Sequence, residues 1–333
     1  MSDKNNKLLL DIRNLSVRFD TDSGEVHAVN NLNLSLEKGK ALGFVGETGA
    51  GKTTTALAIL QLIQSPPGKI LNGEIFFEGQ NILEMSEAER RDIRGGKIAM
   101  IFQDPMTSLN PIMTVEDQIA EMISLHSRLK TDAALKRAQE MLNLVGIRPE
   151  RGRDYPHQFS GGMRQRVGIA IALACTPTLL IADEPTTALD VTIQAQVITL
   201  IKDLQKKVNT SLLLITHDLG IVAEICDDVA IMYAGRVVEC SNIAQLYSRP
   251  MHPYTQGLFD AVPRLDSKPG GRLKVIQGLM PDPTDLPKGC SFSPRCPYAQ
   301  SICYEAACGI KEYDPGHFVD CYFPLGLNGG QGI

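Results

Sequence analysis

The chain has 333 residues, of which 43% are hydrophobic, and its formal net charge is −5. This length suits one large domain with an appendage or two domains, and the acidic balance excludes a global basic field for nucleic acid. The longest apolar stretch, residues 167–175, is well short of the roughly 18 residues that predict a membrane span. The polar start is followed by only three consecutive leucines, too few for a signal-peptide core. We therefore expect a cytosolic chain that reaches a membrane only through partners.

Residues 8–45 alternate short apolar runs with turns, which predicts an antiparallel sheet. The last of these runs, 41–45, leads into GETGAGKT at 46–53 and then into a helix-like stretch beginning near Lys52. Strand, glycine loop and helix in this order are the context that a GxxxxGK[ST] phosphate loop requires. An ordinary glycine turn is the alternative, and this context makes it the weaker one.

The loop predicts a binding site for a nucleotide polyphosphate. Its backbone N–H groups and the N-terminus of the following helix would bind the phosphates. Lys52 would reach the β- and γ-phosphates, and the hydroxyl of Thr53 would ligate Mg²⁺. The predicted nucleotide-binding residues of this segment are Gly46, Glu47, Thr48, Gly49, Ala50, Gly51, Lys52, Thr53 and Thr54.

Between this loop and residue 160 the pattern changes from strands to helices. A further strand pair is expected at 73–77 and 97–102, with a short helix within 81–95. Apolar residues then recur at helical spacing over 115–145. The apolar run 98–102 ends in the amide of Gln103, which on its own would be an ordinary loop residue.

The segment 159–190 places a glycine-rich helix start, FSGGMRQR, ahead of the apolar strand LLIADE at 179–184. Two carboxylates at the end of a strand buried on both faces predict an ion site. Asp183 would hold the hydration shell of Mg²⁺, and Glu184 would accept a proton from the attacking water or orient it. Two solvated acids after a core strand are the alternative.

His217 ends the aliphatic run 212–216, one strand after the Asp183–Glu184 pair. A lone histidine in such a position is more often a packed or surface residue than a catalytic one. In a parallel sheet, however, neighbouring strand ends open onto the same crevice, where ligands of α/β sheets bind. The spacing thus favours a place for His217 beside the two acids.

After Glu239 frequent prolines predict a loop-rich appendage, with a linker at 266–272. Four thiolates can ligate a tetrahedral zinc or an iron–sulfur cluster, and a metal can replace a core too small to hold itself together. Unliganded buried thiols and redox thiols stay open as alternatives, because the spacing matches neither paired zinc knuckles nor the common ferredoxin runs. The clustered cysteines lie within 32 residues, at Cys290, Cys296, Cys303, Cys308 and Cys321.

In the order of these motifs, together with the turn at 188–190, the chain resembles an ABC-type ATPase over about residues 8–245. The resemblance implies an α/β fold, with a P-loop ATPase core, an antiparallel β subdomain and a helical subdomain at about 104–165. It also implies a nucleotide-binding domain at 1–245 and a small loop-rich, metal-binding extension at 246–333. One departure is that residues 20–26 lack the aromatic side chain on which this family usually stacks adenine.

The family closes two cassettes head to tail around ATP, so Ser160, Gly161 and Gly162 would bind the partner's nucleotide. The resemblance makes Glu184, His217 and Gln103 the catalytic residues. Gln103 would sense the γ-phosphate and join Thr53 and Asp183 as a magnesium ligand. His217 would steady the γ-phosphate and the attacking water, and Asp190 would belong to the nucleotide-binding set.

Three longer segments resemble the oligopeptide and dipeptide importer branch, which also includes nickel uptake systems. They are FQDPMTSLNP at 102–111, SGGMRQRV at 160–167 and RPMHPYTQGLFDAVPRL at 249–265. The resemblance implies a subunit at the cytoplasmic face of the membrane that hydrolyses ATP to power an importer. Its partners would be two integral membrane permease subunits, a second ATPase subunit that is usually a different chain, and, indirectly, an extracytoplasmic substrate-binding protein, with no nucleic acid.

Several members of this branch carry a cysteine quartet associated with a [4Fe–4S] cluster. The resemblance assigns the quartet to Cys290, Cys296, Cys303 and Cys321, with zinc as the second choice and Cys308 outside the set. The alternative function is a soluble, non-transport ATPase acting on ribosomes or DNA. The sequence does not distinguish peptides from nickel or other small cargo.

Overall fold

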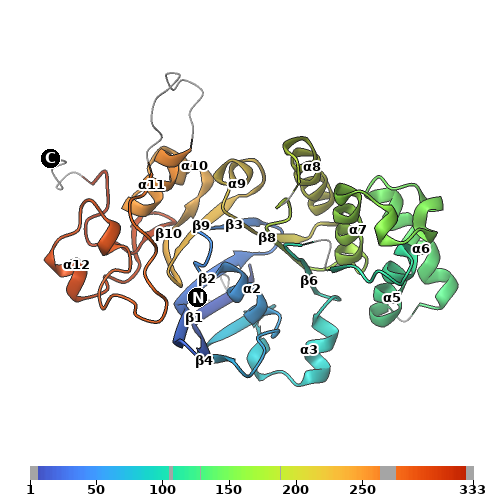
Figure 1. The fold of residues 1–333 in the computed structure, drawn as a ribbon, viewed down its shortest axis with the longest axis horizontal. Coiled ribbons are helices and arrows are strands. Elements are labelled where there is room, and N and C mark those ends of the chain that lie inside the picture. Colours follow the sequence, from blue (N-terminus) through green and yellow to red (C-terminus); the bar gives the residue numbers. More distant parts are fainter. Residues whose placement is uncertain (1–6, 105–107, 128, 188, 263–274, 328–333) are drawn as a thin grey trace. The chain divides into compact units, whose positions relative to one another are not determined.

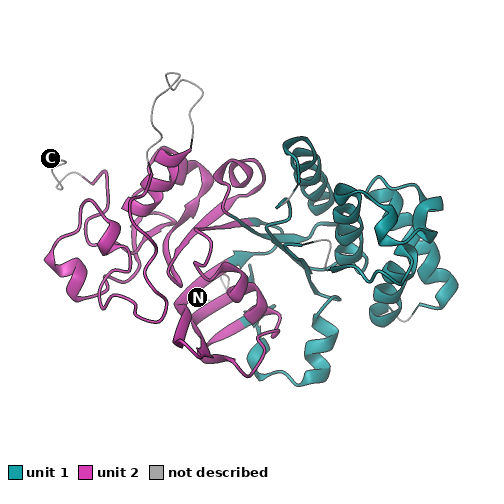
Figure 2. Ribbon diagram, in the orientation of Figure 1, with its two compact units in different colours: residues 1–10, 36–41, 76–216 teal, residues 11–35, 42–75, 217–333 magenta. Residues whose placement is uncertain are grey.

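The computed structural model describes residues 7–104, 108–127, 129–187, 189–262 and 275–327, and the chain forms two compact units (Figure 2). Unit 1 comprises residues 1–10, 36–41 and 76–216, and unit 2 comprises residues 11–35, 42–75 and 217–333. Each unit is therefore built from segments that are far apart in the sequence. The expected linker at 266–272, residue 188 of the expected turn and part of the segment 102–111 lie outside the described residues.

Unit 1 contains the parallel strands β6 (Ile98–Ile101), β7 (Leu179–Asp183) and β8 (Ser211–Thr216), with β7 in the middle. Ile98 lies opposite Leu179, and Asp183 lies opposite Ile215. Every residue of β7 and β8 is buried, as aliphatic runs predict for strands covered on both faces. Because parallel strands end at the same edge, the residues that follow β6 and β7 come together there.

The helices of unit 1 include two that account for the periodic pattern at 115–145. They are α5 (Val115–Ser127) and α6 (Thr131–Leu144), so the expectation of helix in this region is confirmed. The short helix expected within 81–95 is α3 (Glu87–Ile93). α7 (Gly161–Leu173) packs on α5 and α6, and also on β6 and on α8 (Val191–Val208) (Figure 1).

Unit 2 contains, in order across its sheet, β11 (Lys311–Asp314), β12 (His317–Val319), β10 (Arg236–Asn242), β9 (Asp228–Tyr233) and β3 (Ala41–Val45). β3 and β9 are parallel, whereas β10 is antiparallel to both β9 and β12. The helices are α2 (Lys52–Ile59), α9 (Leu219–Ile225), α10 (Ile243–Ser248), α11 (Pro253–Ala261) and α12 (Ser301–Glu305).

The C-terminal appendage is more than a set of loops, because its end returns to the sheet. Val319 of β12 lies opposite Glu239 of β10, and β11 pairs with β12 in turn. These strands were not predicted from the sequence, and they have only four and three residues. Runs this short carry too little periodicity to be recognised.

A second sheet has the strand order β2 (Gly24–Glu37), β1 (Leu8–Thr21), β4 (Gly68–Phe77) and β5 (Gln80–Asn81). The expected pairing of 73–77 with 97–102 is wrong, because the first segment lies in β4 of this sheet and the second contains β6, which pairs with β7. The mixed burial of β4 suits a sheet with one solvated face. The mostly buried β6 suits a parallel strand covered on both sides.

The large apolar side chains form a core inside each unit. Ile181 and Leu213 in unit 1, and Phe44 and Val229 in unit 2, are 0% exposed. Of the helices in the described ranges, none combines enough length with enough apolar character to cross a membrane.

Candidate active site

The glycine loop at 46–53 lies in unit 2 and joins β3 to α2. Lys52, the first residue of α2, is 5% exposed, and its ammonium donates to the backbone carbonyls of Gly46 (2.7 Å) and Glu47 (3.0 Å). The exposed residues of the loop and helix start are Thr48, Gly49 and Thr53. Solvent-facing backbone beside a buried cation suits a polyphosphate.

Two glycines let the loop lie directly against neighbouring backbone. Gly51, the N-cap of α2, has a φ of 104°, and a Cβ there would lie 2.2 Å from the carbonyl oxygen of Ala28. A Cβ on Gly46 would lie 2.2 Å from the carbonyl oxygen of Met232. Backbone cannot move aside as the end of a flexible side chain can, so both positions require glycine.

We expect the Gly51→Ala variant to bind ATP at least about 10-fold more weakly and to lose about 1–3 kcal/mol of unfolding free energy. Alanine is strained at the positive φ of this position, and its Cβ would also clash with the Ala28 carbonyl. The measurements are calorimetric ATP titration and chemical unfolding. Gly79→Ala is the matched control: Gly79 has a φ of 79°, but a Cβ there would meet nothing within 4 Å. Equal loss of ATP affinity in both variants would contradict the steric explanation.

The two acids of the LLIADE segment lie in unit 1. Asp183 is the last residue of β7 and is 2% exposed. Glu184 follows with a φ of 44°, which is rare for a non-glycine residue. Its carboxylate accepts hydrogen bonds from the Gln103 amide (2.8 Å) and from the Thr187 hydroxyl (3.0 Å). The structure thus brings Gln103 and Glu184 together and holds Glu184 in a backbone conformation that clusters at functional sites.

The glycine-rich helix start also lies in unit 1. Ser160 is the N-cap of α7, and its hydroxyl accepts a hydrogen bond from the Met163 N–H at 3.4 Å. Ser160 and Gly161 are exposed, so the positive end of a 13-residue helix faces solvent and can receive an anion. Asp190 caps α8 in the same way, accepting from the Ile193 N–H at 3.0 Å. This capping gives Asp190 a structural role, and its place among nucleotide-binding residues stays a prediction.

The predicted site residues are divided between the units. His217 directly follows β8, is exposed and begins the last segment of unit 2. Unit 2 therefore holds His217 and the loop 46–54. Unit 1 holds Gln103, Ser160, Gly161, Gly162, Asp183, Glu184 and Asp190.

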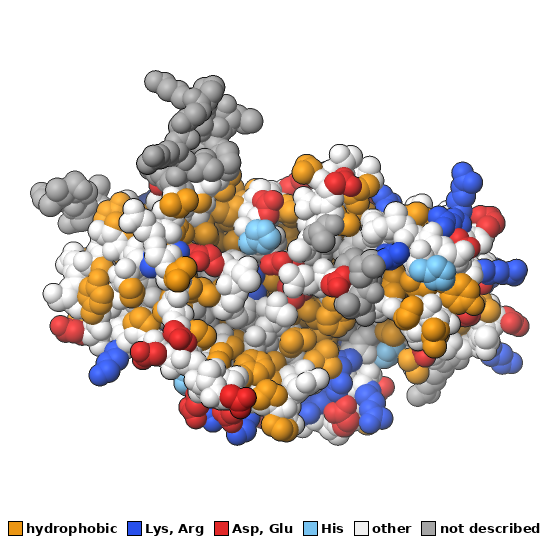
Figure 3. All heavy atoms as spheres, in the orientation of Figure 1, with side chains coloured by type: hydrophobic (Ala, Val, Ile, Leu, Met, Phe, Trp, Pro, Cys, Tyr) orange, Lys and Arg blue, Asp and Glu red, His pale blue; other side chains and the backbone are white. Residues whose placement is uncertain are grey.

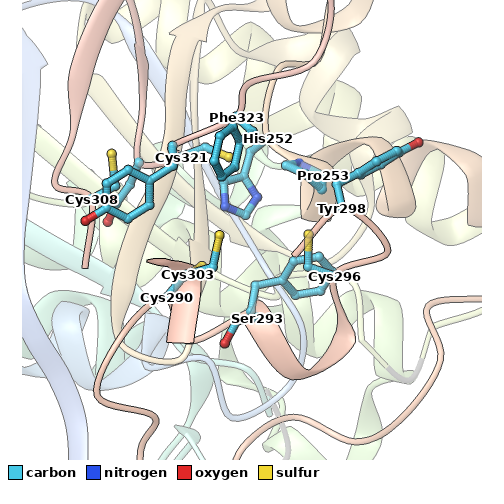
Figure 4. A pocket seen from close by; sticks show the side chains of 13 residues that line it. His252, Pro253, Cys290, Ser293, Cys296, Tyr298, Cys303, Cys308, Cys321 and Phe323 are labelled. Carbon is cyan, nitrogen blue, oxygen red and sulfur yellow. The ribbon is translucent and has the colours of Figure 1, made fainter. Parts of the chain in front are cut away.

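All five clustered cysteines line one apolar cavity of about 20 Å³ in unit 2, which Figure 4 shows. Burial raises the pKa of Cys290 to about 11 and that of Cys321 to about 12, and neighbouring thiols add to both shifts. In the part of the chain that the structure describes, no three His, Cys, Asp or Glu side chains are arranged as a metal site. The donor set thus has the softness that iron and zinc prefer, while its sulfur atoms are gathered without coordination geometry.

Sequence reasoning missed His252, which lines the same cavity. His252 is the N-cap of α11, and its Nδ1 accepts the Tyr254 N–H at 3.0 Å, so the ring proton lies on Nε2. Burial lowers the pKa of His252 to about 4, which keeps the ring neutral. The HPYTQGLF segment contains a visible signal, a capping residue followed by proline at the first helical position. That the cap lies beside the cysteines is visible only in the structure.

Two family models match parts of the chain. Residues 29–187 match the family model described as ABC transporter, and residues 238–303 match that of the oligopeptide/dipeptide transporter C-terminal region. The structure is similar to a dimeric ATP-binding cassette solved in a post-hydrolysis state with ADP and phosphate, at a TM-score of 0.63 and 26% identity, covering 70% of this chain and 98% of that one. Fold and loop therefore define an ATP-binding cassette.

Two relatives place it more closely. The chain is 50% identical to a probable peptide ABC transporter ATP-binding protein of Sinorhizobium fredii, with 95% of each chain covered. It is 49% identical to an oligopeptide transport ATP-binding protein of Escherichia coli, covering 95% of this chain and 94% of the relative. The chain belongs to the family of ATP-binding subunits of oligopeptide and dipeptide ABC transporters.

Proposed function

We propose that this chain binds and hydrolyses ATP to power a membrane importer of oligopeptides or dipeptides. The observation that carries the proposal is the glycine loop with buried Lys52, in a chain that matches peptide-transport relatives over nearly its whole length. The chain would work at the cytoplasmic face of the membrane, attached through its partners.

Each site residue has a role in this proposal. Lys52 and the loop N–H groups would bind the β- and γ-phosphates, while Thr53, Gln103 and Asp183 would hold Mg²⁺, which would supply charge neutralisation at the phosphates. Glu184 accepts the proton of the attacking water, and His217 orients that water and the γ-phosphate. The Gln103–Glu184 hydrogen bond of 2.8 Å supports the pairing of a metal ligand with a general base.

The proposed partners are a second cassette, two integral membrane permease subunits and, indirectly, an extracytoplasmic binding protein. The exposed Ser160 and Gly161 at the start of α7 support a role in binding the partner cassette's ATP. Binding that depends on the γ-phosphate closes the two cassettes, and hydrolysis reopens them because that differential binding is lost.

We also propose that residues 246–333 form an extension that holds an iron–sulfur cluster, with zinc as the second choice. The gathering of Cys290, Cys296, Cys303 and Cys321 around one cavity supports this assignment. Thiol ligands release their protons when a metal binds, so binding would depend on pH. The side chains would also have to turn toward the metal, since they do not form a ready site. A cluster would stabilise an extension that has little core of its own.

Co-purification tests the transport function. We expect the tagged chain, isolated from detergent-solubilised cells of its own host, to bring down two multi-span proteins and a second cassette, identified by mass spectrometry. Recovery of ribosomal or repair proteins instead would support the alternative, a non-transport ATPase. On the face shown in Figure 3, basic and acidic side chains are interspersed, so this face carries no segregated basic stripe of the kind that binds nucleic acid.

A further inference from the structure

Arg295, in the middle of the cysteine-rich segment, reaches the glycine loop. Its side chain is only 6% exposed, and its Nη1 lies 3.1 Å from each carboxylate oxygen of Glu47, the second residue of GETGAGKT. The same Nη1 lies 3.2 Å from the Tyr233 hydroxyl. Its Nε and Nη2 donate to the backbone carbonyls of Gln277 (3.0 Å) and Ile276 (3.4 Å). The guanidinium is thus held from both sides in one orientation.

A second residue of the C-terminal extension, Tyr254 of α11, also contacts Glu47. The Glu47 N–H donates to the hydroxyl of Tyr254 at 3.0 Å. Tyr254 is 0% exposed, and burial raises its pKa, so the hydroxyl stays protonated and neutral. Met280 lies beside the loop as well, since a Cβ on Gly49 would be 3.2 Å from its Cε. All these residues belong to unit 2.

The negative charge of Glu47 is unfavourable for the binding of an anion to the loop. The loop receives a polyphosphate through its N–H groups and Lys52, and a carboxylate in the same loop repels that anion. The Glu47 side chain is only 31% exposed, so water screens it incompletely. Arg295 lies against both carboxylate oxygens and cancels this charge.

We propose that Arg295 is a positioning residue that neutralises Glu47 and so sets the affinity of the glycine loop for ATP. The inference rests on the proposed function, because it assumes that ATP binds at this loop. The affinity for nucleotide then depends on Arg295, which lies in the cysteine-rich segment immediately before Cys296.

The test compares opposite changes of charge in the full-length protein. We expect Arg295→Gln to weaken the binding of MgATP about 10-fold, because Glu47 is then left uncompensated. Glu47→Gln should strengthen binding several-fold, because it removes the repulsion and leaves Arg295 positive. The double variant should return to within about threefold of the wild type, since the loop is again neutral at both positions. The measurement is calorimetric titration at low and high salt, and the differences should shrink at high salt.

Arg249→Gln is the matched control, because Arg249 also lies in the C-terminal extension and forms an ion pair, with Asp314 at 3.1 Å. This variant changes the net charge equally without touching the loop, and its ATP affinity should stay within about twofold of the wild type. Thermal melting shows whether each variant is folded.

If the Arg295–Glu47 contact only holds the loop in its conformation, the variants should change ATP affinity differently. If Glu47→Gln and Arg295→Gln both weaken ATP binding, the neutralisation inference is wrong. The same conclusion holds if the double variant is no better than Arg295→Gln alone. Should Arg295→Gln fail to fold, Glu47→Gln still tests the inference: stronger ATP binding in that variant supports neutralisation, and weaker binding contradicts it. Failure of the wild type to bind ATP would instead contradict the proposed function itself.

Discussion

Glu184→Gln is expected to lower ATP hydrolysis by at least about 100-fold while leaving ATP binding intact. Gln keeps the size and shape of Glu184 but cannot accept a proton from water. The carboxylate is held by Gln103 and Thr187 at 2.8 and 3.0 Å, so the geometry around it is already set. With hydrolysis blocked, the ATP-closed dimer should accumulate, as measured by size-exclusion chromatography with MgATP.

The control for this variant is Glu121→Gln, which removes one exposed carboxylate from α5 in the same unit. Its turnover should equal that of the wild type. Near-normal turnover of Glu184→Gln would remove Glu184 from the mechanism. Loss of ATP binding would mean that the substitution disturbs the site rather than the proton transfer.

The second large effect concerns the cysteine cavity. We expect the chain purified without oxygen to hold about four irons, the content of one cubane cluster. Cys303→Ser should reduce iron and acid-labile sulfide to a small fraction of this, because a cluster ligand is lost. Iron, zinc and sulfide contents per chain are the measured quantities.

Cys308→Ser is the matched control, because Cys308 lines the same cavity but lies outside the proposed quartet. It should keep the full iron content. If it loses as much iron as Cys303→Ser, Cys308 is a ligand and the proposed quartet is wrong. Stoichiometric zinc without sulfide in the wild type would reject the iron–sulfur assignment and favour the second choice.

The Glu47–Arg295 pair and the cysteine cavity are connected through the chain. Arg295 contacts Glu47, and the next residue, Cys296, lines the cavity. Tyr254 contacts Glu47 from α11, whose N-cap His252 also lines the cavity. Two short segments of the chain thus each contact both the cavity and the glycine loop.

The sequence by itself determined those parts of this protein that depend on local chemistry. The strands at 41–45 and 179–183, the helix that begins at Lys52 and the periodic helices at 115–144 follow from aliphatic runs, glycines and apolar spacing. The meeting of Gln103 with Glu184 is not among them, because the pattern predicted that 97–102 pairs with 73–77, whereas the structure pairs β6 with β7.

Only the tertiary structure decided which distant residues meet. Glu47 and Arg295 are 248 positions apart, and no periodicity or motif relates them. His252 could be recognised as a helix cap, but its place beside the cysteines depends on how the chain returns through β12 to β10. Local patterns report the backbone conformation of one segment, whereas a long-range contact is set by packing among many segments, which one sequence does not encode in any short window.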